Sequence, residues 1–270
     1  MTRREAIDRD GYIIVPGLLS PDEVKLLKNS LTSHFAREWV WESLGKHQPN
    51  AAIKIPEISW LFTHTPILSV FRELYGQETL VFTGNCDAHV NMLNSWHKDV
   101  SLELGALRGE SFFSPECRIY RAGVYLQDHD RGHDGLTVRR GSHRSSSKNT
   151  GDIAYLQTKA GDVVFFDARL THTGRQPDWF EFLLYRLVRR LNWPKLGFYV
   201  KESYWKIVRK APKLSVFFTY GTMDGFTREF CAFEFQTKSK DKDVESRYLP
   251  ASFVRSLSQA GIVPYSDLVH

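Results

Sequence analysis

The sequence predicts a mainly β fold with flanking helices, either a barrel or a double-sheet jelly roll. From about residue 80, short apolar runs rich in β-branched and aromatic residues are separated by Gly, Asn and Asp, a pattern typical of strands joined by turns. Helical periodicity is confined to a few segments outside these runs. The length of 270 residues suits a single large domain, 1–270, better than two complete domains.

A strand and a helix are expected at the start of the chain. Residues 11–17 form a short apolar run that ends in Pro-Gly, which predicts an opening strand. Ser20 is expected to cap the next helix, with Pro21 at its first position and Glu23 completing a capping box. Leucines then follow at helical spacing, so a helix is predicted over residues 20–35.

The predicted core strands are short and rich in apolar, β-branched and aromatic residues. They lie within residues 79–84, 117–128, 135–141, 161–170 and 213–221. Residues 145–151 are interpreted as a polar loop. A charged stretch at 238–246 is expected to be a solvated linker into a closing helix near 251–260.

Residues 177–194 break the strand pattern and predict an amphipathic helix inserted between two strands. Asp178 is the expected cap, and one helical face is apolar. The whole insertion, about 176–212, is basic. Residues 175–213 contain ten basic and three acidic residues, a local net charge of +7 against +5 for the chain.

Composition favours a reducing compartment. The three cysteines are far apart and odd in number, which argues against a disulfide framework. The charged N-terminus lacks the apolar core of a secretion signal, and no stretch approaches the ~18 apolar residues of a membrane span. We therefore expect a cytoplasmic protein without membrane contact. No known nucleic-acid-binding module occurs, so nucleic acid is not an expected partner.

The triplet His97-Lys98-Asp99 is the first candidate for chemistry. Side chains alternate along an extended segment, so His97 and Asp99 point to one side and Lys98 to the other. Two imidazoles and one carboxylate on one face of a metal leave three positions open, as in non-haem Fe(II) oxygenases. Such a triplet alone is weak support for a metal site.

A third ligand is expected at His172. Residues 161–167 are interpreted as a turn and a strand, and His172 follows closely. A jelly roll can bring the end of this late strand beside the earlier triplet. The alternative is that His172 merely caps a strand end at the surface.

Four motifs in this order resemble the phytanoyl-CoA dioxygenase family of Fe(II)/2-oxoglutarate oxygenases: RDGYIIVPGLLSPDEV, WHKD, YLQDHDRGHDGLTVRRGSHR and GDVVFFDARLTHTG. They span roughly residues 9–175, and KLSVFFTYG resembles the last core strand of the family. Each motif is loose alone, but the four together are specific. The resemblance implies a double-stranded β-helix (a cupin-like jelly roll) with His97, Asp99 and His172 as the Fe(II) ligands and catalytic residues.

The resemblance also implies that 2-oxoglutarate and O2 are co-substrates. Decarboxylation of 2-oxoglutarate to succinate and CO2 would be coupled to oxidation of a bound substrate. Relatives that chlorinate have Gly or Ala at the position of Asp99, so the carboxylate here favours hydroxylation or desaturation.

In the family, an arginine at the head of the last core strand holds the distal carboxylate of 2-oxoglutarate, often with a serine two residues later. Here Lys213 takes the arginine position and Ser215 the serine position, on one strand face. A lysine supplies a point charge instead of a bidentate fork. Arg209 and Arg175 are alternatives, and Lys213 as an ordinary strand-edge residue is equally open. Thr137 completes the expected contacts of the co-substrate.

Several other polar residues near these motifs have the composition of a site, but a structural role is the default interpretation for them. Residues 128–134 have the composition of a metal loop, but a solvated turn is the stronger interpretation. His143 matches a family histidine that is not a ligand. Tyr120, Tyr125 and Gln127 are candidates for the pocket wall, with core packing as the default.

The basic insertion bears on the substrate. It directly follows the expected third ligand, so it is a candidate lid or rim. A basic rim suits an anionic small molecule, such as a phosphorylated metabolite, a nucleotide-sugar or a CoA thioester, or an acidic carrier protein. The alternative is a packing or dimerisation helix whose charges are simply solvated.

Two other functions are considered. A non-oxidative cupin-like metal or ligand-binding protein stays open because lysine replaces the family arginine. Zinc hydrolysis is disfavoured, because no general base stands beside the ligands.

Overall fold

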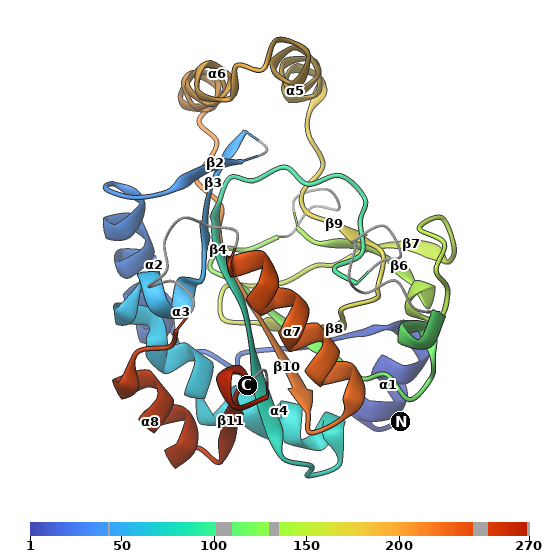
Figure 1. The fold of residues 1–270 in the computed structure, drawn as a ribbon. Helices are drawn as coiled ribbons and strands as arrows, with labels where there is room; N and C mark the ends of the chain where they lie inside the picture. Colours follow the sequence, from blue (N-terminus) through green and yellow to red (C-terminus); the bar gives the residue numbers. More distant parts are fainter. Residues whose placement is uncertain (43, 101–109, 130–134, 240–247, 269–270) are drawn as a thin grey trace.

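Two sheets form the centre of the fold in the computed structural model, which describes residues 1–42, 44–100, 110–129, 135–239 and 248–268. Within these residues the larger sheet has the order β1-β8-β5-β10-β4-β3-β2, with β11 parallel to β4. The smaller sheet has the order β7-β6-β9. The two sheets and the helices around them are consistent with the expected double-stranded β-helix (Figure 1).

The strands have these bounds: β1 Tyr12–Val15, β2 Val40–Glu42, β3 Gly45–Pro49, β4 Leu80–Val90, β5 Tyr120–Tyr125, β6 Thr137–Arg140, β7 Asp152–Tyr155, β8 Val163–Asp167, β9 His172–Thr173, β10 Leu214–Thr222 and β11 Ile262–Pro264. The α-helices are α1 Arg3–Asp10, α2 Pro21–Phe35, α3 Ala51–Lys54, α4 Thr65–Tyr75, α5 Trp179–Leu191, α6 Pro194–Ile207, α7 Gly225–Ser239 and α8 Ala251–Gln259. Short 3₁₀ helices are η1 Pro56–Thr63, η2 Glu110–Phe113, η3 Ser142–Arg144 and η5 Tyr265–Asp267.

Strand β8 shows why its sequence is a continuous apolar run. Val163 and Phe165 face the main core between the large sheet and the helices, whereas Val164 and Phe166 face the core between the two sheets. All four side chains are buried, because both faces of the strand are covered. Each such burial stabilises the fold by about 1.5–3 kcal/mol.

Local signals correctly placed α2 and the inserted helix α5, whereas α1, which precedes them, was not predicted. Ser20 and Glu23 form the expected capping box of α2, and Asp178 and Glu181 form an equivalent box at the start of α5. The opening strand and the closing helix are confirmed as β1 and α8. The linker expected at 238–246 lies mostly outside the described residues.

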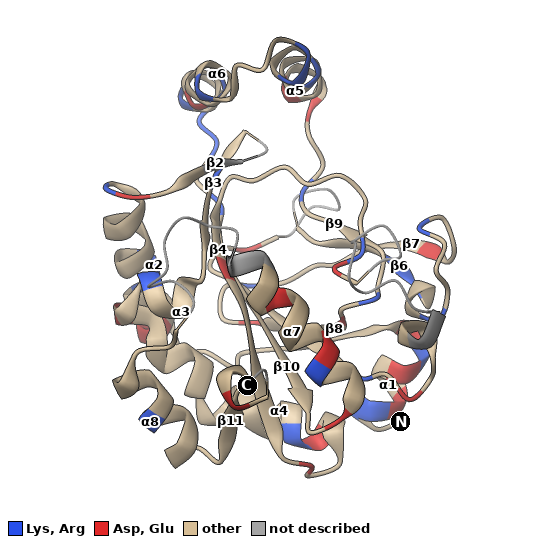
Figure 2. Cartoon of the chain, viewed as in Figure 1, with Lys and Arg blue, Asp and Glu red and all other residues tan. Residues whose placement is uncertain are grey.

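The insertion contains two helices where the sequence predicted one. Helices α5 and α6 form a hairpin that stands away from the two sheets and carries many basic residues (Figures 1 and 2). At their contact, a Cβ on Gly197 would lie 2.2 Å from a methyl carbon of Val188. Glycine at this position therefore lets the two helices approach closely. No helix in the described part of the chain is long and apolar enough to cross a bilayer.

Candidate metal and co-substrate site

The structure brings the three expected ligands together. The backbones of His97 and His172 form an antiparallel bridge in which each N–H donates to the carbonyl of the other, both at 2.9 Å. One ligand atom each from His97, Asp99 and His172 lies within 4.8 Å of the others. His172 is only 5% exposed, so it is not a surface cap.

Backbone carbonyls set the orientation of both imidazoles. The Nδ1 of His97 donates to the carbonyl of Ser95 at 2.7 Å, and the Nδ1 of His172 donates to the carbonyl of Leu170 at 2.9 Å. A carbonyl only accepts, so each Nδ1 bears the proton and each Nε2 keeps its lone pair. The two Nε2 atoms lie 3.6 Å and 3.8 Å from Oδ1 of Asp99. Three donor atoms therefore converge on one point.

The protonation states of this group suit a metal ion. Burial lowers the pKa of His172 to about 4, and the neighbouring His97 adds to the effect. Burial alone would raise the pKa of Asp99, but Arg121 and the two imidazoles hold it below its ordinary value. At neutral pH the set therefore offers a carboxylate and a neutral imidazole at position 172.

Lys98 points away from its two neighbours, as the strand alternation predicts. It is 2% exposed, and its ammonium donates to the carbonyls of Ser142 at 2.7 Å and Arg169 at 2.6 Å. These bonds tie the segment to the loops behind it. Lys98 thus fixes the segment from which His97 and Asp99 project.

An open cavity lies beside the three ligands, which form part of its wall. Lys213 and Ser215 line it. Lys213 stands just before β10 and Ser215 is the second residue of β10, so the alternation of side chains puts both on one face. Tyr125 also lines it, and its hydroxyl is buried without a hydrogen-bond partner among the described residues. Such a hydroxyl is suited to donate to a bound carboxylate. The residues therefore fit an iron ion with 2-oxoglutarate beside it.

The other residues expected to bind 2-oxoglutarate are less well placed to do so. Arg175 lines the cavity, but its guanidinium is bound by both carboxylate oxygens of Glu181, at 2.7 and 2.6 Å. Arg209 is exposed and does not line the cavity. Thr137 is buried in β6, and its hydroxyl has no hydrogen-bond partner within the described chain.

Arg121 is a site residue that the sequence interpretation missed. Its Nη1 lies 2.9 Å from Asp99 and its Nη2 lies 2.7 Å from Asp87. Next to it on the cavity face is Gly123, where a Cβ would lie 2.9 Å from the ring of Phe217. The sequence did contain a signal for Arg121. Residues two apart on a strand share a face, so Arg121 lies on the same face as Tyr125, which was a candidate for the pocket wall.

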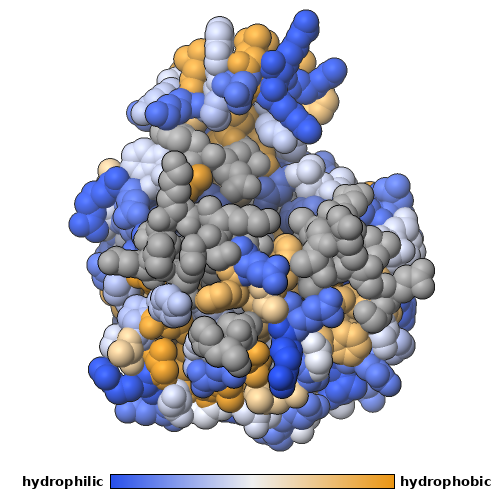
Figure 3. Space-filling view, in the orientation of Figure 1, coloured by the Kyte–Doolittle hydropathy of each residue, from blue (hydrophilic) through white to orange (hydrophobic). Residues whose placement is uncertain are grey.

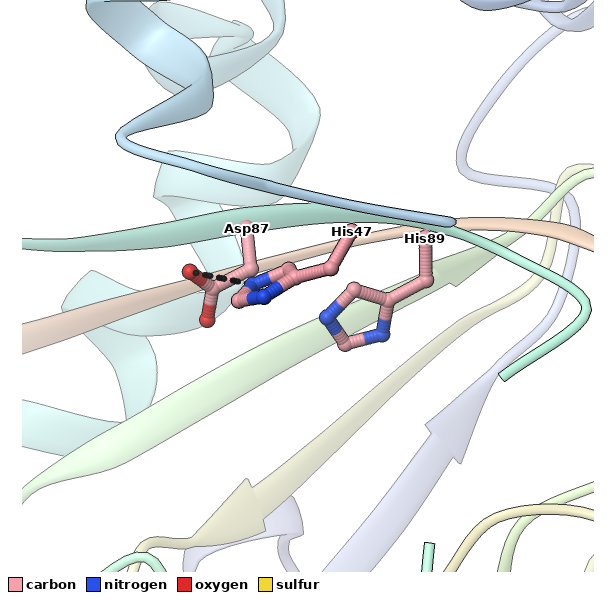
Figure 4. A group of neighbouring side chains, drawn as sticks. All are labelled: His47, Asp87 and His89. Atoms are coloured by element: carbon pink, nitrogen blue, oxygen red, sulfur yellow. Dashed lines mark ion pairs between the residues drawn. The ribbon is translucent and has the colours of Figure 1, made fainter. Parts of the chain in front are cut away.

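A second group with the composition of a metal site was also missed. His47, Asp87 and His89 come from β3 and β4, and their donor atoms lie within 4.8 Å of one another (Figure 4). Nε2 of His47 lies 3.4 Å from Oδ1 of Asp87. Burial lowers the pKa of His89 to about 3, with His47 contributing, so this imidazole is neutral. The group lines an open space shared with His97, Asp99 and Arg121.

One residue of the predicted solvated turn, His129, proves to line the cavity. His129 was expected in a solvated turn, but it is 2% exposed, lines the cavity and lies 3.0 Å from the amide of Gln127. Its Nδ1 lies 2.9 Å from the hydroxyl of Thr158, so pairing with a neighbouring loop draws it inward. The rest of that turn, 130–134, lies outside the described residues.

The other polar and aromatic residues near the motifs lie either in the core or at the cavity. His143 is buried and binds the backbone carbonyl of Asp8 at 3.1 Å, away from the cavity. Tyr120 faces the main core, where its ring packs against Tyr75. Gln127 lines the cavity together with Tyr125.

Solved structures confirm the fold class. The non-haem α-ketoglutarate-dependent epimerase SnoN of nogalamycin biosynthesis is 19% identical, with a TM-score of 0.58 over 81% of this chain and 80% of that one. HygX from Streptomyces hygroscopicus, solved with nickel, 2-oxoglutarate and hygromycin B, is 17% identical, with a TM-score of 0.58 over 82% and 87%. EctD from S. alaskensis, solved with 2-oxoglutarate and 5-hydroxyectoine, is 19% identical, with a TM-score of 0.55 over 82% and 75%.

A search among curated proteins gives no match. A family model, described as phytanoyl-CoA dioxygenase, matches residues 7–176, well over half of the chain. This interval contains all three expected ligands and the four sequence motifs. The chain therefore belongs to the phytanoyl-CoA dioxygenase family, and it is an oxygenase that uses iron, 2-oxoglutarate and O2.

Proposed function

We propose that this oxygenase hydroxylates a small anionic molecule in the cavity beside His97, Asp99 and His172, which hold the iron. One observation carries the assignment of the ligands. Both imidazoles are fixed at Nδ1 by backbone carbonyls and turn Nε2 towards the same oxygen of Asp99. A histidine pair with these constraints is prepared for a metal before the metal arrives.

Each ligand has a defined task in this proposal. The two Nε2 atoms and Oδ1 of Asp99 would hold the iron, and the cavity beside them would take 2-oxoglutarate. The bound iron supplies the activation of dioxygen, with electrons from 2-oxoglutarate. Arg121 keeps Oδ2 of Asp99 engaged, so that Oδ1 stays directed at the histidines.

Lys213, Ser215 and Tyr125 are our candidates for the distal carboxylate of 2-oxoglutarate. All three line the cavity. A lysine attracts the carboxylate as a point charge, and the two hydroxyls supply direction through hydrogen bonds. Arg175 is a weaker candidate, because Glu181 already takes both of its terminal nitrogens.

The group of His47, Asp87 and His89 is our candidate for substrate contact. It shares an open space with the proposed ligands and with Tyr185 of α5. Imidazoles and a carboxylate here suit a polar substrate that is held by several hydrogen bonds. The positive charge of the hairpin above favours an anion.

The substitution His172→Ala tests the assignment. Wild-type protein with Fe(II) and 2-oxoglutarate, without oxygen, is expected to show the weak visible band of the bound chelate, and to release succinate in air. His172→Ala is expected to lose both. The matched control is His143→Ala, which removes a buried histidine outside the cavity and is expected to keep both signals. A His172→Ala protein with the wild-type band and turnover contradicts the assignment.

The substrate class needs a separate experiment. Candidate phosphates, nucleotide-sugars and CoA thioesters are screened for stimulation of succinate release, and products are analysed by mass spectrometry. A product heavier by one oxygen atom supports hydroxylation. Stimulation by neutral compounds only contradicts the anionic class, and a product that has lost two hydrogens contradicts hydroxylation.

A further inference from the structure

The hairpin of α5 and α6 has an exposed apolar face. On α5, every fourth residue from Trp179 to Leu191 is a large exposed hydrophobic residue, which forms one stripe along the helix. On α6, Leu196, Tyr199 and Ile207 are 54%, 59% and 80% exposed. Figure 3 shows hydrophobic atoms on the outer side of the hairpin, next to hydrophilic side chains. Contiguous exposed apolar surface of this kind marks a binding face.

The hairpin also has a packed inner side, so the exposed apolar face is not simply an unpacked core. The rings of Phe180 and Tyr204 pack at a centroid distance of 4.3 Å, and the indole of Trp205 donates to the buried Glu181 at 2.5 Å. The ammonium of Lys201 is buried and donates to the carbonyls of Leu44 and Asn91. The hairpin therefore has a packed inner side, and the outer residues are left over from this packing.

The exposed charges around this face have one sign. Asp178 is bound by Lys210 and Tyr204, Glu181 is fully buried, and Glu202 accepts from Asn91. None of the acidic residues in the fully described segment 175–213 is exposed. The exposed basic residues are Arg186, Arg189, Arg190, Lys195, Lys206, Arg209 and Lys210.

We propose that the outer face of the α5–α6 hairpin docks on the surface of an anionic lipid bilayer. An apolar stripe with tryptophans near the helix ends and cations beside it is the pattern of a helix that lies in the bilayer interface. Trp179 and Trp193, 72% and 55% exposed, are suited to the headgroup level. This inference does not depend on the proposed reaction.

Charge decides between the bilayer and other occupants. In a dimer formed through this face, the arginines of one copy would meet those of the other, and like charges across an interface are costly. A bilayer with anionic headgroups neutralises the cations and accepts the apolar stripe in one step. An acidic protein would also satisfy the charges, but the exposed Trp179 and Trp193 near the two ends of the α5 stripe favour the headgroup level of a bilayer.

The hairpin that carries the docked face starts and ends at the cavity. The insertion begins just after Arg175 and ends just before Lys213, and both residues line the cavity. Tyr185, on the inner side of α5, lines the space shared by the two histidine groups. The hairpin therefore joins the docked face to the cavity.

Vesicle co-sedimentation tests the proposal with the full-length chain. Wild-type protein is expected to sediment with phosphatidylcholine vesicles that contain phosphatidylglycerol, to stay in solution with phosphatidylcholine alone, and to be released by high salt. The variant Trp179→Ser/Leu183→Ser/Leu187→Ser is expected to bind at least about tenfold more weakly. The variant Arg186→Glu/Arg190→Glu is expected to lose the preference for the anionic lipid.

The matched control is Ile153→Ser/Tyr155→Ser, which removes two apolar side chains on β7 that are 47% and 43% exposed. It is expected to bind vesicles like wild type. Unchanged thermal unfolding in all variants shows that the fold is intact. The proposal is overturned if wild type ignores anionic vesicles, or if the stripe variant binds them as well as the control does. It is also overturned if ultracentrifugation shows a dimer that the stripe variant abolishes while neither protein binds lipid.

Discussion

The guanidinium of Arg121 lies 2.9 Å from Oδ2 of Asp99 and also 2.7 Å from Oδ2 of Asp87. One buried cation thus bridges the carboxylates of the two histidine groups. Although burial opposes its charge, these two carboxylates raise the pKa of Arg121 above its ordinary value. Because all three groups are largely desolvated, each depends on the others.

Replacing this cation is expected to destabilise the protein. Arg121→Met leaves two buried carboxylates without their partner, which typically costs about 3–5 kcal/mol. Urea unfolding of the metal-free protein measures the loss. The control Arg118→Met removes an arginine whose side chain is 32% exposed and lies 3.8 Å from Glu78. The control is expected to change stability by less than about 1 kcal/mol, and an equal loss in both variants contradicts the bridge.

The position of Lys213 predicts its effect on co-substrate affinity. Lys213→Met removes a charged hydrogen bond worth about 1.5–3 kcal/mol, which corresponds to a loss of roughly ten- to a hundredfold in the affinity for 2-oxoglutarate. Anaerobic titration calorimetry with Fe(II) measures it. Arg209→Met removes an exposed cation that does not line the cavity, and it is expected to leave the affinity unchanged. The reverse order of effects would assign the carboxylate to Arg209.

The two histidine groups are expected to differ in metal binding. His89→Ala should keep the chelate band with Fe(II) and 2-oxoglutarate, because the group at 97, 99 and 172 is intact. It should weaken substrate binding, seen as a higher KM for the substrate that stimulates succinate release. Loss of the band in His89→Ala but not in His172→Ala would place the iron in the other group.

Lys201 gives a prediction about pH. Burial lowers its pKa from 10.5 to about 7, with Arg175 contributing. Between these values the unfolded chain holds a proton that the folded protein has released, so the free energy of unfolding rises with pH. Relative to Lys201→Met, wild type should gain stability from pH 7 to 9.5, by at most about 1.4 kcal/mol per pH unit. Urea unfolding at several pH values measures this difference, and a flat or falling difference contradicts it.

Local signals in the sequence were enough for much of the fold. Capping residues such as Ser20 and Asp178 identified α2 and α5, and the strand alternation placed Lys213 and Ser215 on one face. Helix α4 was missed although Pro66 stands at its start and its buried residues follow a helical period. Here the signal was present in the sequence.

Other features depend on contacts between distant segments. Arg121 is unusual in a buried strand, but nothing near it in the sequence shows that its partners are Asp87 and Asp99. His47 lies on a short strand, β3, that was not predicted, so the second histidine group was not recognised. The sequence interpretation expected no membrane contact because no span was found, and the bilayer docking that we propose requires no span.

The paired backbones of His97 and His172 have a consequence for how this protein can change. Two hydrogen bonds, not the length of the intervening chain, set the spacing of the two imidazoles. Loops between them, such as 145–151, can therefore be lengthened or exchanged while the ligands keep their places. The hairpin follows the second ligand, so changes in the hairpin also leave this backbone pairing in place. Substrate selectivity and the proposed membrane docking can thus evolve, or be engineered, separately from the capacity to oxidise.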